Sequence, residues 1–414
     1  MIQYNDPTLA ASNSRAFPAY LTTMKTTILL ALTVLLSSSH FAALRAAPTL
    51  AESLAALKNI GVQGKGQAEA AKAMAVLSAQ PASSLVPLLT ALNTASPLEA
   101  NWLRGAIESV FDRAVKTQSA ALMGDLEKFT LATTNSPRAR RLSFELLTRI
   151  KKSAPEQLLP QMLDDPSLEL RRDAIEYQLK LFAAKSLSKE AYLAEYQKLF
   201  ERARDLDQID KMATHLREQG AKVDQPRHMG FVMNWKVIGP FDNREKKGFP
   251  VAYPPEKEIN PAAVYDGKEG PVKWIAAESS DRYGVVDLNK AIGKHMGAVA
   301  YALAELQIDK ETPCELRLGS INANKIWLNG ELLHEREVYH ASTNIDQYTA
   351  RGTLKPGTNT ILLKICQNEQ TENWAQDWQF QLRVCDEIGT AILAKNRAAT
   401  PAAAMEPPPP KKEK

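Results

Sequence analysis

The chain has 414 residues, 44% hydrophobic and 24% charged, a composition typical of globular proteins, and its length suits two domains with added segments because single cores rarely exceed about 250–300 residues. The formal net charge is +4, but residues 1–47 contribute +2 and residues 394–414 contribute +3, which leaves −1 on residues 48–393. Such a near-neutral body lacks the basic face that a phosphate backbone requires, so the charge argues against a nucleic-acid partner.

Residues 1–47 carry the pattern of an export signal. Met24-Lys25 precedes the apolar run TILLALTVLL, and small residues occupy most of Ala42–Ala47. A positive start, a short apolar core and small residues near a cleavage point are typical of a secretory signal peptide. The run is too short for the roughly 20 residues of a membrane-spanning helix, so we expect a secreted or periplasmic chain that begins between Ala43 and Pro48. An uncleaved anchor stays an alternative, and Met24 is the expected start of translation.

Residues 48–225 show helical periodicity. Ser96-Pro97, Ser136-Pro137 and Asp165-Pro166 each open a helix, and Glu99 completes a capping box with Ser96. The three openers are 40 and then 29 residues apart, a spacing expected for two-helix solenoid repeats. An apolar helix is predicted before each opener, at residues 85–92, 122–131 and 158–163. Further helices are predicted at residues 53–60, 68–77, 189–200 and 206–216.

The stretch LLPQMLDDPSLELRRDAIEYQL resembles a HEAT repeat, and SPLEANWLRGAIESV and SPRARRLSFELLTRI are looser copies. The resemblance implies an α-solenoid that binds a protein partner; the alternative is a spacer or a packing partner for the second domain. A basic ridge could form on this array, but such charges are usually paired with nearby Asp and Glu. Its arginines would be Arg138, Arg140, Arg141, Arg171 and Arg172.

Residues 226–393 change to a strand pattern, with turn signals such as Asn329-Gly330 and strict alternation in CELRLG and FQLRV. This pattern predicts an antiparallel β-sandwich or jelly roll. The predicted strands are residues 231–238, 272–275, 284–288, 298–308, 314–319, 325–328, 360–366 and 378–384.

Several of these segments resemble the galactose-binding-domain-like jelly roll of exported bacterial proteins. They are WKVIGPF, GVVDL, VAYALAEL, ELRLGSINANKIWLNGELL, LKPGTNTILLKICQ and WQFQLRV, in the same order as in that family. The resemblance implies a module that in some relatives binds carbohydrate. The sequence departs from the family at the acidic Asp-Asp-Gly loop, which is here Ile321-Asn322-Ala323-Asn324. This departure argues against a metal-assisted ligand site.

No catalytic motif was recognised, so we expect a non-catalytic protein without a cofactor or a metal. The sequence has no G-x-S-x-G elbow and no H-E-x-x-H motif. His334 and His340 would lie about 20 Å apart on an extended chain, too far for one metal. Cys314, Cys366 and Cys385 match no metal spacing and are interpreted as buried thiols, with one disulfide as the alternative.

Loop aromatic and polar residues are the remaining ligand-binding candidates. Trp374 lies in TENWAQD, and Arg282 and Tyr283 lie in SSDRYG; Asn322 and Asn324 precede the KIWLNG hairpin. A loop tryptophan beside polar groups can stack a sugar ring, but it more often closes the end of a sandwich, and we expect the latter for Trp374. Trp235, Trp327 and Trp378 are expected to pack in the core.

The last segment, residues 394–414, is rich in Pro, Ala and Lys and is predicted to be disordered. Together the patterns predict an exported scaffold or binding protein. Its helical array would bind a protein, and its sandwich would contact a ligand or a second partner. The alternative is a carbohydrate-binding module on a helical spacer, with a hydrolase accessory as a more distant hypothesis.

Overall fold

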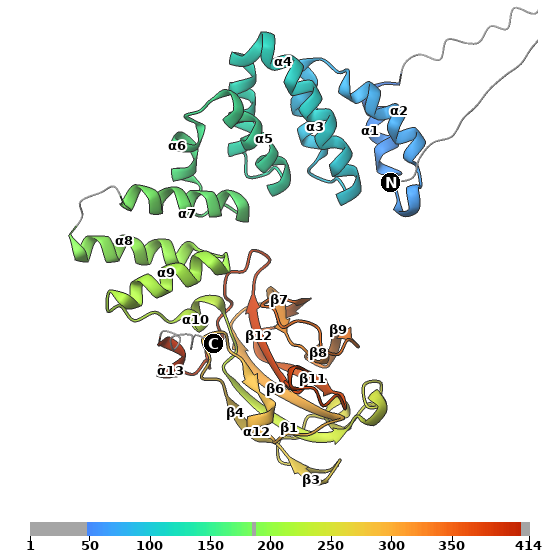
Figure 1. The fold of residues 1–414 in the computed structure, drawn as a ribbon, viewed down its shortest axis with the longest axis vertical. Coiled ribbons are helices and arrows are strands. Elements are labelled where there is room, and N and C mark those ends of the chain that lie inside the picture. The colour runs from blue at the N-terminus through green and yellow to red at the C-terminus, as the bar shows by residue number, and fades with distance from the viewer. Residues whose placement is uncertain (1–47, 184–187, 407–414) are drawn as a thin grey trace, which may run out of the picture. The chain divides into compact units, whose positions relative to one another are not determined.

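The computed structural model describes residues 48–183 and 188–406, in which a helical region precedes antiparallel β-sheets (Figure 1). This confirms the predicted fold class. The export signal lies outside the described residues. Among the described residues no helix has the length and apolar character needed to cross a membrane. The helices before the sheets are α1 (Leu50–Lys58), α2 (Gln67–Ser78), α3 (Leu85–Ala91), α4 (Pro97–Leu131), α5 (Pro137–Ile150), α6 (Ala154–Leu158), α7 (Leu168–Ala183), α8 (Lys189–Arg202), α9 (Leu206–Glu218) and α10 (Gln225–Met229).

Local capping fixes where several helices begin. The Ser96 hydroxyl accepts from the backbone N–H of Glu99, whose carboxylate accepts from the N–H of Ser96, so the predicted capping box is present. Ser136 caps α5 in the same way through the N–H of Ala139. The third opener is shifted, because α7 begins at Leu168 and the side chain of Ser167 accepts from Leu170.

One predicted helix break is wrong. The sequence predicts separate helices after Ser96 and at residues 122–131, whereas α4 is a single helix of 35 residues. Residues 112–121 contain neither Gly nor Pro, so nothing in the backbone interrupts the hydrogen-bond ladder between the two apolar stretches. The irregular spacing of the openers follows from this fusion.

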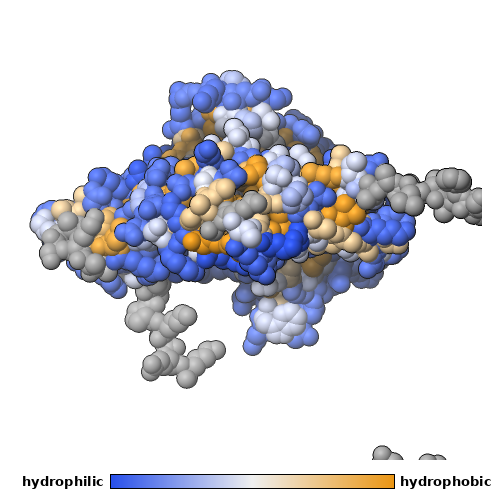
Figure 2. Space-filling view, turned by 90° about the horizontal axis from the view of Figure 1, so that it is seen from above, coloured by the Kyte–Doolittle hydropathy of each residue, from blue (hydrophilic) through white to orange (hydrophobic). Residues whose placement is uncertain are grey.

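The helices pack on a continuous apolar core that runs from Leu57 to Ala174. One ion pair is buried in it: the Arg140 guanidinium donates to both carboxylate oxygens of Asp165 at 2.7 and 2.6 Å, and both side chains are at most 5% exposed. This pair ties the first turn of α5 to the turn before α7. Isolated hydrophobic side chains remain on the surface, and Figure 2 shows such residues between hydrophilic ones on the face seen from above.

The β region consists of two main open sheets. The six-stranded sheet has the order β4-β1-β6-β11-β8-β9, the four-stranded sheet has the order β10-β7-β12-β5, and β2 pairs with β3 in a small hairpin. The strands are β1 (Asn234–Asp242), β2 (Val264–Gly267), β3 (Gly270–Lys273), β4 (Ile275–Glu278), β5 (Val286–Asp287), β6 (Ala298–Ile308), β7 (Thr312–Gly319), β8 (Ala323–Leu328), β9 (Glu331–Arg336), β10 (Tyr348–Leu354), β11 (Gly357–Gln367) and β12 (Gln379–Cys385).

Apolar side chains from both main sheets meet in one core, which makes the pair a sandwich. Leu316, Leu318 and Leu382 come from the four-stranded sheet, and Leu363 and Ile365 come from the six-stranded sheet. The predicted strand at residues 298–308 coincides with β6. Strands β2, β4, β9 and β10 were missed, because their exposed and partly exposed residues do not form a clean apolar alternation.

The three cysteines are buried free thiols, which confirms their main interpretation. Cys385 pairs in register with Glu315, so its side chain lies on the outer face of the sheet, whereas Cys314 points into the core between the sheets. The predicted core tryptophans are confirmed, since Trp235, Trp327 and Trp378 are 8% exposed or less.

The structure differs from the predicted disorder for residues 394–406. Asn396 donates to the Glu305 carbonyl at 2.9 Å, and Thr400 donates to the Asp224 carboxylate at 2.7 Å. Ala404, in α13 (Ala402–Met405), is fully buried in a core shared with α9 and α10. The two hydrogen bonds join residues 91 and 176 positions apart, so local composition could not predict them.

A further apolar core joins the last helices to the β region. It contains Met212 and Leu216 of α9 together with Phe231 and Met233 from the segment before β1. The boundary predicted between residues 225 and 226 falls at the start of α10. Independent folding of the two halves stays a prediction.

Candidate functional site

The five predicted ligand-binding residues occupy separate places rather than one site. Asn322 and Asn324 are fully buried, whereas the side chain of Trp374 is 60% exposed. Arg282 and Tyr283 lie beside the helices, where the Tyr283 hydroxyl donates to Asp210 of α9 at 2.6 Å. Asn324 donates to the Asn322 carbonyl at 3.0 Å, and Asn322 is linked indirectly to Trp374.

Asn322 supports the loop that carries Trp374. Its amide nitrogen donates to the Gln367 side chain at 2.8 Å and to the Asp377 carbonyl at 3.1 Å, while its oxygen accepts from the N–H of Gln379. The Gln367 amide in turn donates to the Ala375 carbonyl at 2.9 Å. Both the nitrogen and the oxygen of the Asn322 side-chain amide are bonded to other residues of the protein, so Asn322 holds the loop in place and is not a ligand contact.

Trp374 is the exposed member of this arrangement. It lies in a short 3₁₀ turn (Asn373–Ala375) whose last residue, Ala375, is fully buried. The expectation that Trp374 closes the end of the sandwich is wrong, because Trp378 fills that interior instead and is 0% exposed. The buried Ala375 and the hydrogen bonds of Asn322 and Gln367 hold the loop in place, while the indole of Trp374 stays exposed to solvent.

His340 forms the other side of the exposed indole. The two rings meet edge to face with centroids 5.4 Å apart, and His340 Nε2 lies 2.8 Å from the Asn368 side-chain oxygen. Tyr339, the residue before His340, is also held by polar neighbours. Its hydroxyl accepts a hydrogen bond from Asn243, and the Lys246 ammonium lies 5.2 Å from its ring centre. We call Trp374, His340 and Tyr339 the aromatic loop end. Flat aromatic surface next to amide and charged groups suits a polyhydroxylated ligand.

Arg282 and Tyr283 serve the junction with the helices. The Arg282 guanidinium lies 4.7 Å from the Tyr283 ring centre, and burial together with the Asp210 hydrogen bond raises the pKa of Tyr283 to about 12. Tyr283 also packs against the core that contains Phe231. A role in holding α9 against the β region accounts for both residues.

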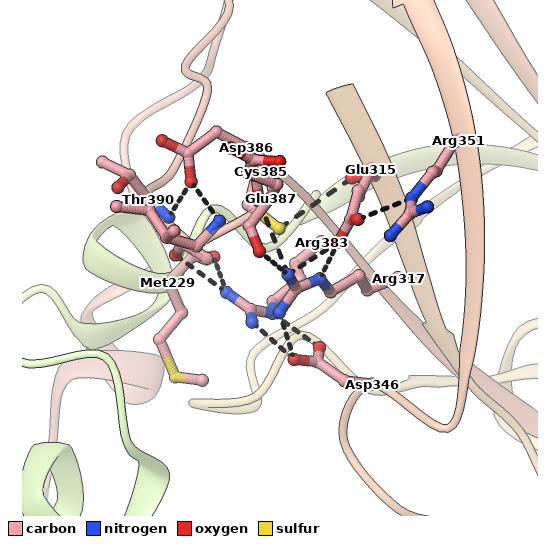
Figure 3. Close-up of polar contacts among 12 residues, drawn as sticks. Met229, Glu315, Arg317, Asp346, Arg351, Arg383, Cys385, Asp386, Glu387 and Thr390 are labelled. Atoms are coloured by element: carbon pink, nitrogen blue, oxygen red, sulfur yellow. Dashed lines mark hydrogen bonds and ion pairs between the residues drawn. The ribbon is translucent and has the colours of Figure 1, made fainter. Parts of the chain in front are cut away.

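The outer face of the four-stranded sheet carries an ion network that sequence analysis missed (Figure 3). Arg383 of β12 and Arg317 of β7 both donate to Asp346, with the Arg383 Nε bond at 2.6 Å and the Arg317 Nη1 bond at 3.0 Å. Glu315 accepts from Arg317 at 2.8 Å and from Arg351 at 3.1 Å. Alternation had placed Glu315 and Arg317 on one face of their strand, but the positions of Asp346 and Arg351 come from the fold.

Next to this network, three adjoining hollows form a groove that begins on the helices and passes between them and the β region. Their volumes are about 320, 820 and 240 Å³. The first two share Arg104 and Arg138, and the second and third share Leu168 and Ile388, so they adjoin one another. We call this feature the arginine groove, because seven arginines and five carboxylate side chains line it. Most of the predicted ridge arginines are paired as expected, for example Arg172 with Asp207 at 2.6 Å.

Burial makes the cysteines poor nucleophiles. It raises the pKa of Cys314 and Cys385 to about 11 and that of Cys366 to about 12, so the thiolate form is scarce near neutral pH. Among the described residues, no group of three or more His, Cys, Asp and Glu side chains is arranged to hold a metal ion.

Comparison with known proteins shows no family assignment. No family model matches the chain, and no curated protein matches it in sequence. Solved structures with partial similarity include an anti-sigma factor domain-containing protein (8% identity, 41% of this chain, 48% of that chain, TM-score 0.25). A second one, from Clostridium clariflavum, has 9% identity, 44% and 49% coverage and a TM-score of 0.23. A β-glucosidase from Kluyveromyces marxianus has 15% identity, 38% and 16% coverage and a TM-score of 0.23. The chain spans about half the length of the first two.

Proposed function

We propose that this chain is an exported, non-catalytic binding protein. Its helices form a HEAT-like array that receives a protein partner in the arginine groove. Its β region is a galactose-binding-like sandwich with a separate ligand surface. The observation that carries the proposal is the arginine groove, because its central hollow of about 820 Å³ is lined by α4, α5 and α7 together with Arg351, Glu387 and Ile388 of the β region, and is large enough for several residues of another chain.

Site-specific crosslinking tests the scaffold role. The three native thiols are buried, so a maleimide photocrosslinker attaches selectively to an introduced exposed cysteine. Thr133→Cys places the probe in the groove, and Lys72→Cys places it on α2, away from the groove lining. We expect a specific protein adduct from Thr133→Cys alone, and the identified partner should bind the parent chain when purified. Equal adducts from both positions would reject the groove as the partner site.

Export is a separate part of the proposal. Mass spectrometry of protein recovered outside the cytoplasm should show a mature N-terminus between residues 43 and 48. Recovery of a chain that still begins at Met1 or Met24 would instead indicate that the apolar run TILLALTVLL is retained as an anchor.

A second candidate function is carbohydrate binding, and the exposed Trp374 favours it. A tryptophan 60% exposed on a loop held by buried amides contributes little to packing, whereas indole faces commonly stack on sugar rings. On a glycan array, any saccharide bound by the parent should lose about tenfold or more in affinity with Trp374→Ala. The matched control is Val264→Ala, which shortens a side chain 64% exposed on β2. Unchanged binding by the Trp374 variant would exclude the aromatic loop end.

A further inference from the structure

We propose that the arginine groove recognises an extended acidic segment of a partner protein. This inference rests on the proposed scaffold function and specifies the chemistry of the partner. Three observations support it: the concentration of arginines in the groove, two of them that have no carboxylate partner, and one strongly exposed arginine at its β-sheet side.

The groove is rich in arginine, and most of its arginines are paired. Seven arginines and five carboxylates line it, and three carboxylates beside it, Glu108, Asp173 and Glu315, pair with Arg104, Arg141, Arg317 and Arg351. The positive charge that can meet an acidic ligand therefore lies at the arginines that are unpaired or strongly exposed. The basic C-terminal sequence KKEK has the wrong sign to occupy the groove itself.

Two groove arginines make no ion pair with any carboxylate of the described residues. Arg138 is exposed and donates to the Ala95 carbonyl at 3.2 Å. Arg204 is half-buried and donates to the Thr390 hydroxyl at 3.3 Å and to the carbonyls of Glu201 and Ala203. Burial lowers the pKa of Arg204, which means that its charge is destabilised where it stands. A carboxylate supplied by a partner would relieve this cost.

Arg351 extends the positive surface to the β region. Its side chain is 84% exposed, and its Nε bond to Glu315 leaves other N–H groups of the guanidinium facing outward (Figure 3). A guanidinium presents several donors in a planar fork that matches a carboxylate. Carboxylates spaced along an extended peptide could meet Arg138, Arg351 and Arg204 in turn, because these residues line successive hollows of the same groove.

A peptide fits the groove better than a nucleic acid does. Glu145, Glu169 and Glu387 also line the central hollow and would repel a continuous phosphate backbone. A peptide can place its carboxylates at the arginines and neutral residues at the glutamates. The mixture of charges therefore selects for an acidic peptide whose carboxylates meet the arginines and avoid the glutamates.

Fluorescence anisotropy with the full chain tests this inference. The probes are a labelled 12-residue peptide of alternating Glu and Ser, the same peptide with Gln for Glu, and a 12-nucleotide single strand. We expect the acidic peptide to bind at low salt and to lose affinity as salt rises. Arg138→Glu should weaken this binding about tenfold, and Arg204→Gln should weaken it severalfold. Lys72→Glu, a charge reversal on exposed α2, should change it less than about twofold. Circular dichroism melting confirms that each variant is folded.

The other outcomes overturn the inference in distinguishable ways. Equal binding of the Gln peptide, or of the acidic peptide to Arg138→Glu, would show that charge does not select the ligand, while the scaffold function would stand. Competition by the oligonucleotide with equal affinity would assign the groove to polyanions in general. Loss of all peptide binding with retained crosslinking through Thr133→Cys would reject the acidic segment alone, and loss of both would reject the scaffold function as well.

Discussion

The outer faces of the two main sheets are covered by different chemistry. On the four-stranded sheet, Arg317, Arg383 and Glu315 form a network with Asp346, and Arg383 reaches the carbonyl of Met229 in α10 (Figure 3). On the six-stranded sheet, an apolar cluster covers the strands. In it Phe249, Val272 and Trp274, from the segment after β1, pack on residues of β6, β8 and β11. Ion pairs and hydrogen bonds therefore stabilise the outer face of the four-stranded sheet, whereas burial of hydrophobic surface stabilises that of the six-stranded sheet.

The apolar face nevertheless contains two buried cations, Lys364 and Lys325, which lie opposite each other on β11 and β8. Lys364 of β11 is fully buried, and its ammonium donates to the carbonyls of Phe249 and Val251 and to Glu256 at 2.7–2.9 Å. Tyr301 of β6 also donates to Glu256. Burial lowers the pKa of Lys364, although Glu256 opposes this shift. Lys364 has one carboxylate partner, whereas Asp346 and Glu315 in the network each accept from two arginines.

The largest expected effect follows from this single carboxylate partner. Glu256→Ala should reduce the free energy of unfolding by about 3–5 kcal/mol, because it leaves the Lys364 ammonium buried without its carboxylate. Chemical denaturation measures the loss, and Glu258→Ala, at an exposed position two residues away, is the control. The double variant Glu256→Leu with Lys364→Met should recover most of the stability, since it removes both charges. A loss below about 1 kcal/mol for Glu256→Ala would show that the ammonium is hydrated.

On the charged face the loss should be smaller. Asp346→Ala should cost about 2–3 kcal/mol, because Arg383 and Arg317 keep their bonds to Met229, Gly389 and Glu315. Burial raises the pKa of Asp346, but the arginine hydrogen bonds outweigh it and lower that pKa overall. The control is Asp309→Ala, which removes an ion pair to Lys395 whose two side chains are 66% exposed and should cost about 0–1 kcal/mol. Equal losses for Glu256→Ala and Asp346→Ala would remove the distinction between the two faces.

The contrast between the faces also marks what the sequence could predict. Helix caps and strand alternation depend on residues two to four positions apart, so the starts of α4 and α5 and the strands β7 and β12 were predicted. The Lys364–Glu256 contact joins residues 108 positions apart, and the Asn396 bond to Glu305 joins residues 91 apart, so both needed the fold. Trp374 was singled out correctly as a loop residue, but its exposure depends on Trp378 filling the interior, which the sequence does not reveal.

Acid should loosen the side of the molecule on which α10 covers the four-stranded sheet. Burial lowers the pKa of His228 in α10 to about 4, and its ring packs on Phe200 with centroids 4.4 Å apart. The unfolded state, with a pKa near 6.5, binds the proton first, so stability is full above pH 6.5 and falls between pH 6.5 and 4. This residue alone should cost about 2 kcal/mol at pH 5. In denaturation curves from pH 7 to 5, His228→Gln should show a smaller loss than the parent, and an identical loss would mean that His228 is not the responsible group.

The smallest expected effect is at Trp374, which belongs neither to the ion network nor to the apolar cluster. Trp374→Ala should change the free energy of unfolding by less than about 0.5 kcal/mol, because the indole is 60% exposed and its loop is held from below by Asn322 and Gln367. Trp378→Ala is the matched comparison and should cost about 3–5 kcal/mol, since that side chain is fully buried and donates to the Ile365 carbonyl. Both losses are measured by denaturation under the same conditions. If Trp374→Ala costs as much as about 2 kcal/mol, the indole packs against the loop end in solution and is not free to stack on a ligand. If its cost is near zero, the indole does not contribute to the stability of the fold, and its exposed surface is free to contact a ligand.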